Sequence, residues 1–403
     1  MAPEEVGVNP TGNRNGPFHG LTRDAVLLSF VSFFADTATE MLYPVLPIFL
    51  TQVLLAPVSA VGIIEGIADG TRNIVQGFSG WFADRVQRRK PVALVGYGVA
   101  AAAKPFIGLA VNWPQVLAAR FLDRLATGVR SAPRDALIAG SVQEAYRGKA
   151  FGVEGIGDNL GAFVGPLIAA ALIFAFHLDL RLIFFLAFIP GALAFLTVAL
   201  VKESPLPAPG GGAPSLRPSQ FPAAYWRYLL VAGLFGLGSI SSAFLILETK
   251  AIGASTETAI LIYAFFNLVA AMVSYPIGMI SDRVGRKLPL LASFVIAAVT
   301  YLGFALSSSL LVIGALFVLY GAYSGIFRAT GRALATDFVP QAIRASGVGW
   351  YSSTVGITSL VANIVGGQLW SLIGPAYTFG YALFFSIVGT LALSLLRIPR
   401  RQP

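Results

Sequence analysis

Residues 80–90 read GWFADRVQRRK and lie between two long apolar segments. The stretch carries four basic residues and one carboxylate, and it returns as GMISDRVGRK at residues 278–287, about half the chain length further on. Two arginine pairs repeat at the same offset: Arg130 with Arg328, and Arg134 with Arg332. The chain therefore reads as one unit written twice, a pattern typical of transport proteins built from internal repeats.

Each residue type in this stretch suits a short loop between membrane helices. A glycine at a helix end lets another helix approach closely. A carboxylate one turn later can pair with an arginine or with the amides of a helix N-terminus, and basic residues keep such a loop in the cytoplasm. The spacing resembles the signature G-x-x-x-D-R-x-G-R-K of the major facilitator superfamily. The second copy matches it in full, whereas the first has Gln87 where the family has glycine.

This resemblance covers nearly the whole chain. It implies an all-α membrane protein with twelve transmembrane helices in two pseudo-symmetric six-helix bundles. It also implies that the two loops steady a cytoplasmic gate, with Asp84 and Asp282 pairing with arginines or with a helix N-terminus. The residues that we assign to this gate are Gly80, Asp84, Arg85, Arg88, Gly278, Asp282, Arg283 and Arg286.

The composition leads independently to a membrane protein. Hydrophobic residues make up 56% of the 403 residues and charged residues only 12%, with a mean hydropathy of +0.75, whereas soluble domains hold about 25% charged residues. Cysteine is absent and only two histidines occur, which excludes disulfides and argues against a metal site. The net charge of +9 reflects a cytoplasmic bias of Lys and Arg rather than nucleic-acid binding. We expect no cofactor and no enzyme activity, because the chain has neither a phosphate-binding P-loop nor a catalytic constellation in a loop.

Apolar segments of about 20 residues each span a bilayer as a helix. An even number of spans puts both termini on one side, and Lys and Arg gather in the loops and tails of that side, so we predict cytoplasmic termini at the inner membrane. The twelve predicted spans are 25–49, 58–80, 91–111, 115–138, 149–174, 181–201, 228–248, 258–280, 288–308, 310–335, 346–370 and 376–396.

The predicted domains follow from these spans. Residues 1–24 form an N-terminal cytoplasmic tail, residues 25–202 the first six-helix bundle and residues 225–397 the second. Proline and glycine are dense between them, and this density predicts a flexible cytoplasmic linker at residues 203–224. Residues 398–403 form the C-terminal tail. We expect a monomer in the lipid bilayer.

Ionisable residues lie inside several predicted spans. Such a residue costs about 2.5–3.5 kcal/mol on insertion scales, so it is usually paired or functional. At about 1.5 Å per residue, five of them fall near one midplane level: Asp36, Asp69, Lys104, Arg124 and Asp158. We expect Asp36, Glu40, Asp69 and Asp158 to carry protons, because transporters hold substrate and coupling ion at this depth. Arg124 would hold one of these carboxylates in its ionised form. The alternative to proton transport is that these charged residues form a salt-bridge network that only stabilises the first bundle.

The second half of the chain has no midplane acid in its predicted spans. It offers amide, tyrosine and serine side chains instead, together with many phenylalanines, a wall that suits an amphipathic organic molecule. Aromatic residues at helical spacing also serve simple packing. The substrate-cavity residues that we predict are Arg120, Lys104, Asn267, Tyr320 and Tyr351.

Two helix motifs narrow the class further. Residues 124–128, Arg-Leu-Ala-Thr-Gly, resemble the R-x-x-x-G element of span four in proton-coupled members of the superfamily, where the resemblance gives the arginine a role in proton transfer. Gly152, Gly161, Gly165 and Pro166 resemble the antiporter motif of the drug/proton families, which here closes with alanines instead of a glycine pair. Packing of small residues between helices is the alternative reading of these glycines.

These features predict a secondary transporter of a drug/proton-antiporter-like prokaryotic branch. We expect proton-coupled efflux of small organic compounds as the two halves rock around a midplane cavity. An importer or exchanger of anionic metabolites, held by Arg120, Arg124 and Lys104, is the first alternative and differs in the charge of its substrate. A non-transporting membrane sensor on the same scaffold is the second, and it predicts no flux in proteoliposomes.

The predicted topology is testable because the chain has no cysteine of its own. A single cysteine at Gln52 should react with an impermeant maleimide in whole cells, since the loop near residues 51–57 is predicted to lie outside. A cysteine at Gln87 should react only after lysis. The reverse pattern of labelling would overturn the predicted orientation.

Overall fold

The computed structural model describes residues 20–86, 88–203, 218–340 and 343–397, with the side chains of residues 80–86 and 345 left aside. In the first half the helices are α1 (Arg23–Leu42), α2 (Val45–Ile48), the π-helical η1 (Phe49–Val53), α3 (Val58–Val86), α4 (Arg89–Leu109), α5 (Trp113–Ser141), η2 (Glu144–Tyr146), α6 (Arg147–Phe176), α7 (Leu180–Leu186) and α8 (Phe188–Leu200). In the second half they are η3 (Pro218–Gln220), α9 (Ala223–Gly236), α10 (Ser242–Ala251), α11 (Thr256–Val284), α12 (Lys287–Leu306), α13 (Leu310–Asp337), α14 (Arg344–Ile373) and α15 (Pro375–Leu395).

The all-α fold is confirmed, and each of the twelve predicted spans coincides with one helix or with an interrupted helix. Three spans are interrupted. The first breaks at Tyr43, where Pro44 and Pro47 follow and cannot donate a backbone hydrogen bond. The sixth breaks at Ala187 and the seventh after Gly236.

Nine segments of the described chain are long and apolar enough to cross a membrane. The helices α3 and α5 are not among them, because each carries several charged residues along its length. The predicted seventh span is also not among them, since it consists of two short helices, α9 and α10. The three exceptions are therefore two helices rich in charged residues and one span made of two short helices.

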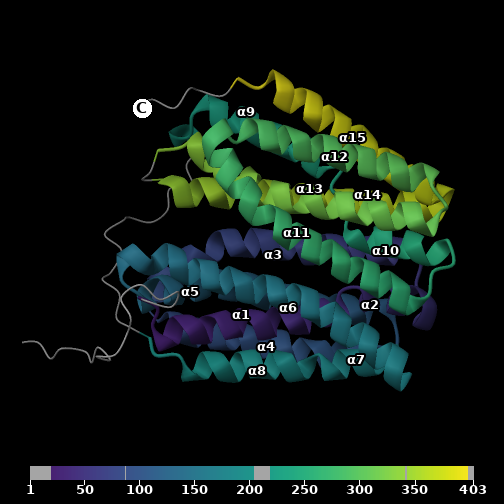
Figure 1. The fold of residues 1–403 in the computed structure, drawn as a ribbon, viewed down its shortest axis with the longest axis horizontal. Coiled ribbons are helices and arrows are strands. Elements are labelled where there is room, and N and C mark those ends of the chain that lie inside the picture. The colour runs from purple at the N-terminus through teal and green to yellow at the C-terminus, as the bar shows by residue number, and fades with distance from the viewer. Residues whose placement is uncertain (1–19, 87, 204–217, 341–342, 398–403) are drawn as a thin grey trace, which may run out of the picture.

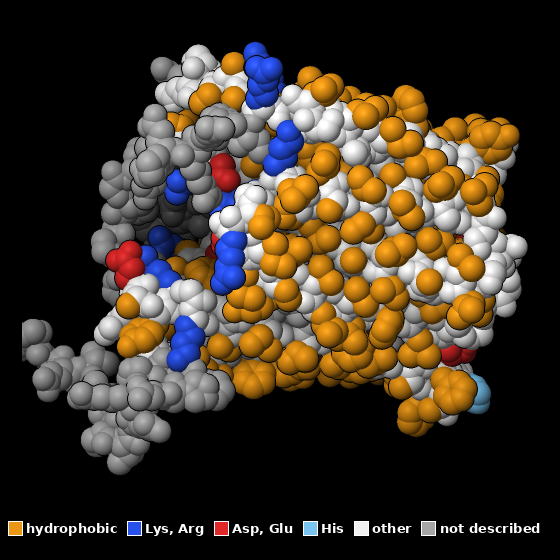
Figure 2. All heavy atoms as spheres, turned by 45° about the horizontal axis from the view of Figure 1, so that its top comes forward, with side chains coloured by type: hydrophobic (Ala, Val, Ile, Leu, Met, Phe, Trp, Pro, Cys, Tyr) orange, Lys and Arg blue, Asp and Glu red, His pale blue; other side chains and the backbone are white. Residues whose placement is uncertain are grey.

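The two halves of the chain form two adjacent helix bundles (Figure 1), with α1 to α8 in one and α9 to α15 in the other. The contacts between the bundles run mainly between α3 and α14 and between α6 and α11. The broad side surface carries many hydrophobic side chains (Figure 2). Large apolar residues such as Phe106, Phe174 and Leu311 are more than half exposed. Such a surface is stable against lipid rather than water.

The core of the second half is rich in aromatic rings. The rings of Phe235 and Phe294 stack with their centroids 3.6 Å apart, and Tyr228 and Tyr351 stack in parallel planes beside them. Two buried tyrosines of this half have hydrogen-bond partners inside the bundle. The Tyr225 hydroxyl group donates to the Gly347 carbonyl oxygen, and the Tyr228 hydroxyl group donates to that of Gly331. Burying an aromatic body while pairing its hydroxyl group is the favourable arrangement in a helix bundle.

The predicted domain boundaries remain predictions over most of the linker, because residues 204–217 lie outside the described residues. The tails at residues 1–19 and 398–403 lie outside them as well. The described chain enters the second bundle at α9, which starts at Ala223 after Pro222 and so begins just within the predicted linker.

Glycines bring α3 and α14 together at the end of the molecule that carries α2 and α10. A Cβ atom added to Gly62 would lie 2.9 Å from the Cα atom of Gly367 and would collide with the carbonyl oxygen of Asn363. Towards the other end of the same interface the contact is looser, since a Cβ atom on Gly77 would meet Gly349 at 3.3 Å. Backbone approach at Gly62 therefore holds this end of the interface shut.

We predict that Gly62→Ala loosens the closed end, because the added methyl group cannot fit against backbone atoms. Spin labels at Gln52 and Ala251, one on each bundle at this end, should show longer and broader distances by pulsed electron paramagnetic resonance. Gly380→Ala is the matched control, since a Cβ atom there meets nothing within 4 Å. Identical distance distributions in Gly62→Ala and the parent would contradict this role.

Candidate functional site

A cavity of about 470 Å³ lies between the two bundles. Its volume falls within the roughly 300–1,000 Å³ of typical small-molecule sites. Figure 2 shows the molecule hollowed at one end, with Lys, Arg, Asp and Glu side chains gathered there. This is the end at which α1 begins and α15 ends (Figure 1), so the cavity opens towards the predicted cytoplasmic side.

Charged side chains dominate the lining of the cavity. The acidic groups Asp36, Glu40 and Asp158 come from α1 and α6, hence from the first half alone. Neutral polar groups from the second half include Asn267, Ser324, Tyr351 and Ser352. The arginines come from both halves and are Arg72, Arg124, Arg130, Arg134, Arg328 and Arg332.

The carboxyl groups of Asp36 on α1 and Asp158 on α6 are neighbours, and both line the cavity. Glycines of α6 create this proximity: a Cβ atom added to Gly161 would lie 3.1 Å from the Cβ atom of Asp36, and one on Gly165 would lie 3.1 Å from that of Glu40. A larger residue at either glycine would push α1 away. The packing of small residues therefore sets the distance between the acids.

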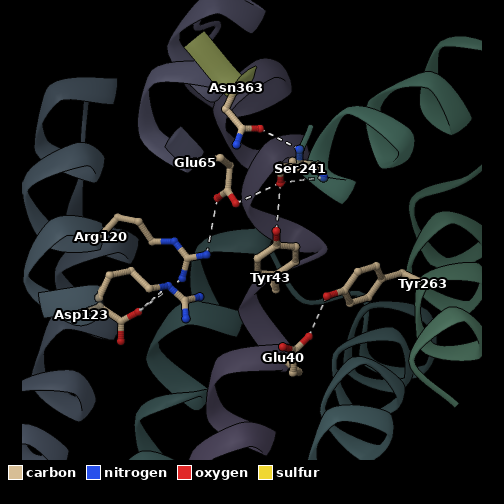
Figure 3. Close-up of polar contacts among 10 residues, drawn as sticks. Glu40, Tyr43, Glu65, Arg120, Asp123, Ser241, Tyr263 and Asn363 are labelled. Carbon is tan, nitrogen blue, oxygen red and sulfur yellow. Dashed lines mark hydrogen bonds and ion pairs between the residues drawn. The ribbon is translucent and has the colours of Figure 1, made fainter. Parts of the chain in front are cut away.

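Glu40 connects the two halves. Its carboxylate accepts a hydrogen bond of 2.8 Å from the Tyr263 hydroxyl group (Figure 3). It also accepts one of 3.3 Å from the amide of Asn267, which lies on α11 like Tyr263. Asn267 also donates to the carbonyl oxygen of Ala162 on α6, at 3.0 Å. The inner wall of the cavity is thus held by hydrogen bonds between the bundles.

A second set of polar contacts lies beyond the cavity, towards the closed end (Figure 3). The hydroxyl groups of Tyr43 and Ser241 lie 2.9 Å apart, and Ser241 donates to Glu65 at 3.2 Å. The backbone amide of Ser241 donates to the side-chain oxygen of Asn363 at 2.7 Å. Tyr43 and Glu65 belong to the first half and the other two residues to the second, so these bonds join the bundles where the cavity ends.

Asp123 on α5 gathers three buried cations. Its carboxylate lies 3.1 Å from Lys104, 3.3 Å from Arg120 and 3.6 Å from Arg124, and all four residues are at most 3% exposed. Arg120 extends to Glu65 as well, at 3.5 Å. A charge buried this deeply is tolerated only with such partners.

The prediction that Lys104 and Arg120 line the substrate cavity is therefore wrong, because both point into this buried ion cluster. Tyr320 is also not part of the lining, since it is 7% exposed and donates its hydroxyl group to the backbone of Ile240 at 3.2 Å. Asn267 and Tyr351 do line the cavity, as predicted.

Of the five residues predicted for proton coupling, four line the cavity: Asp36, Glu40, Arg124 and Asp158. Asp69 is not in the lining, although it is near enough to Arg72 and Arg124 to attract both. Sequence reasoning did not assign Arg130, Arg328 and Arg332 to the cavity. Their recurrence at the repeat offset was the signal that could have placed them there.

The packing motif of α6 is only partly as predicted. A Cβ atom on Gly152 would meet nothing within 4 Å, so this glycine does not mediate close packing. Gly157, one turn before Gly161, takes that role, because a Cβ atom there would collide with the backbone of Ser29. Pro166 is buried next to Gly165.

The predicted gating residues lie at the open end. Arg286 pairs with Asp282 at 3.6 Å and with Asp337 at the end of α13 at 2.9 Å, while Arg283 and Arg88 are exposed. Gly278 has open space around it. The side chains of Gly80, Asp84 and Arg85 lie outside the described residues, so the gating role of both loops remains a prediction.

Two helix bundles around a charged cavity that opens at one end form the architecture of a secondary transporter that works by alternating access. The chain belongs to the Major Facilitator Superfamily, whose family model matches residues 28–247 and 228–403. The predicted family is therefore confirmed, and the protein is a membrane transporter rather than an enzyme.

Several relatives of similar sequence bear the names of transport or resistance proteins. The chain is 31% identical to an uncharacterized MFS-type transporter of Methanocaldococcus jannaschii, over 93% of this chain and 94% of that protein. It is 25% identical to the multidrug resistance protein MdtG of Klebsiella pneumoniae, over 92% and 93% of the two chains. It is 27% identical to a probable 4-methylmuconolactone transporter of Cupriavidus pinatubonensis, over 81% of each.

Solved structures share the fold. A mutant form of the nucleoside transporter NupG superposes with a TM-score of 0.78 at 13% identity and covers 93% of this chain and 100% of its own. A POT family transporter in complex with a thioalcohol-conjugated peptide superposes with a TM-score of 0.77 at 14% identity, over 93% and 95% of the two chains. At such low identity the likeness concerns the fold alone.

We predict that Asp123→Asn strongly destabilises the protein, by about 3–5 kcal/mol, because Lys104, Arg120 and Arg124 would share a site without its central carboxylate. The thermal midpoint of the detergent-purified variant reports this loss. Asp135→Asn is the matched control on the same helix: its side chain is 45% exposed, and its partner Arg134 keeps Glu154 at 3.0 Å. Equal midpoints for the two variants would show that the cluster does not anchor the bundle.

Proposed function

We propose that the protein is a proton-coupled secondary transporter of small organic solutes, which moves them across the inner membrane by alternating access. The observation that carries this proposal is the placement of two neighbouring carboxyl groups, Asp36 and Asp158, in the lining of the cavity where α6 packs closely on α1. Its termini would face the cytoplasm, and it would act as a monomer. The proposal is limited to solutes small enough for a cavity of about 470 Å³.

The carboxyl pair supports proton coupling by a simple count of donors. Ionised carboxylates only accept hydrogen bonds, so two carboxyl groups can bond to each other only when at least one of them holds a proton. Like charges at such a short distance also disfavour double ionisation. The pair would hold a proton in this state and release it when its surroundings change.

Alternating access provides that change of surroundings. The cavity is open at the predicted cytoplasmic end, and the opposite end is closed by bonds between the bundles, such as Tyr43 with Ser241. Opening that end requires these bonds to break, together with the bond from Tyr263 to Glu40. Glu40 would then lose a donor, so its affinity for a proton would differ between the two states of the cycle.

The direction of transport depends on how substrate and proton share the cavity. Efflux in exchange for protons is the expected mode, and it requires substrate and proton to compete for the same carboxyl groups. The similarity to a multidrug resistance protein supports efflux. In the alternative, an importer or exchanger of anions, Arg120, Arg124 and Lys104 would bind the substrate. Asp123 and Glu65 already hold Lys104 and Arg120, and Arg124 lies 3.6 Å from Asp123. An anion carrier would therefore need other arginines. A non-transporting sensor has no support in the relatives.

We predict that Asp36→Asn abolishes uphill transport driven by a pH gradient but permits downhill exchange of substrate, because Asn cannot carry the shared proton. The substrate is a compound that raises the thermal midpoint of the purified parent protein in a ligand screen, and both modes are measured in proteoliposomes. Glu144→Gln is the control, as this side chain is 88% exposed outside the cavity.

The same assay applies to Glu40→Gln, Asp69→Asn and Asp158→Asn. If each of the four single variants still accumulates or expels substrate against its gradient, the protein is not coupled to protons through these groups. A variant that loses downhill exchange as well has lost substrate binding or folding, and its thermal midpoint separates these two causes.

A further inference from the structure

The arginines of the cavity follow the internal repeat. Arg130 and Arg134 lie one turn apart on α5, and Arg328 and Arg332 lie at the equivalent positions on α13. All four line the cavity. Each half of the transporter therefore presents the same pair of cations to the space between the bundles.

The two pairs differ in their partners. Arg134 is neutralised by Asp135 at 2.9 Å and by Glu154 at 3.0 Å. Arg130 is 7% exposed, its guanidinium group lies 4.0 Å from the ring centroid of Tyr97, and its buried Nε atom has no hydrogen-bond partner. Within the described part of the chain, Arg328 and Arg332 have no ion-pair partner within 4.0 Å. The described acids of the cavity lining lie on α1 and α6, in the other bundle.

We propose that Arg328 and Arg332, with Arg130 opposite them, bind the anionic group of an organic substrate. This inference rests on the proposed transport function and names the class of its substrate. Guanidinium groups match the planar geometry of carboxylates and bind phosphate in the same bidentate manner. Arg328 and Arg332 are both exposed in the open cavity, so a substrate anion can reach their guanidinium groups.

The rest of the cavity wall fits the remainder of a small organic anion. Tyr351 and Ser352 on α14 and Ser324 on α13 offer neutral hydrogen-bonding groups next to the arginines, and Phe327 offers an aromatic face. The enclosed volume of about 470 Å³ suits a free metabolite-sized anion.

Anion binding bears directly on the proton carriers, because the same arginines act on them. Arg130 attracts both Asp36 and Asp158, and Arg328 attracts Asp158 and Glu40 across the cavity. The other charged groups that face these acids are Arg124 and Arg134 on α5 and Glu154 on α6. A substrate anion that occupies Arg130 and Arg328 weakens their hold on the carboxylates and thereby favours proton binding.

Proton and anion would therefore bind together rather than compete. Cooperative binding makes the two move in the same direction, which is co-transport rather than exchange. This outcome differs from the expected efflux by antiport, and the pH dependence of binding distinguishes the two. Binding of an anion should strengthen as pH falls, by up to about tenfold per pH unit for one linked proton, whereas a competing cation should bind more weakly.

Binding to the purified full-length protein in detergent tests the substrate class. The probes are matched trios with one carbon skeleton and different charge: benzoate, benzamide and benzylamine, and likewise nicotinate, nicotinamide and 3-picolylamine, with phenyl phosphate as a further anion. Thermal shift identifies the binders and titration calorimetry gives their affinities. We expect the anions to stabilise the protein more than their neutral and cationic counterparts.

Variants locate the site. Arg328→Gln and Arg332→Gln should each weaken anion binding by about tenfold or more, the range for a lost charge-assisted hydrogen bond. Arg227→Gln is the matched control, since Arg227 is an exposed arginine on α9 of the same half. Anions that bind equally well to Arg328→Gln and to the control, stronger binding of the amides or amines, or no stabilisation by any anion would each overturn the anion assignment.

The pH series separates this inference from the proposed function. If anions bind through Arg328 with an affinity that is independent of pH, proton coupling fails while the anion site stands. If only amides or amines bind, with a clear pH dependence that Asp158→Asn abolishes, proton coupling stands and the anion site fails. Anion binding that strengthens at low pH, and does so less in Asp158→Asn, supports both.

Discussion

Charge placed inside a membrane protein needs a partner, and the carboxylate of Asp123 meets this need for three cations at once. It fixes Lys104 on α4 against Arg120 and Arg124 on α5. Through Arg120 the cluster extends to Glu65 on α3, and Glu65 accepts a hydrogen bond from the other bundle. The first half is thus held together by ionic contacts that also reach the closed end of the transporter. Their removal would leave uncompensated charge in a medium that solvates it poorly.

Small residues determine which helices lie close enough for these polar contacts to form. Gly161 and Gly165 let α6 approach α1, and this approach brings the acids Asp36 and Asp158 close to each other. Gly62 does the same for α3 against α14, at the closed end of the interface between the halves. In a bilayer, close packing and hydrogen bonds drive helix association because hydrophobic burial contributes little. The glycines therefore have both a structural and a functional consequence in this protein.

The cavity is asymmetric in charge although the fold is symmetric in outline. Both halves supply an arginine pair, but among the residues that the structure describes, the acids lining the cavity come from α1 and α6. The paired Arg134 contributes to the packing of its own bundle, whereas Arg328 and Arg332 face open space. An internal repeat thus provides equivalent positions for equivalent side chains, and the local partners decide whether each becomes a structural ion pair or a binding group.

The sequence by itself determined the fold, the family and the positions of the membrane spans along the chain. Apolar segment lengths predicted the spans, and the repeated loop at residues 278–287 predicted two related halves, because both signals depend on residues close together in the chain. Counting along each helix also placed Asp36 and Asp158 at one depth. It could not determine the direction in which a side chain points, since that depends on how distant helices pack. Only the tertiary structure showed that Lys104 points into an ion cluster and Arg328 into the cavity. The reason is that helices distant in the sequence decide whether each side chain meets a partner.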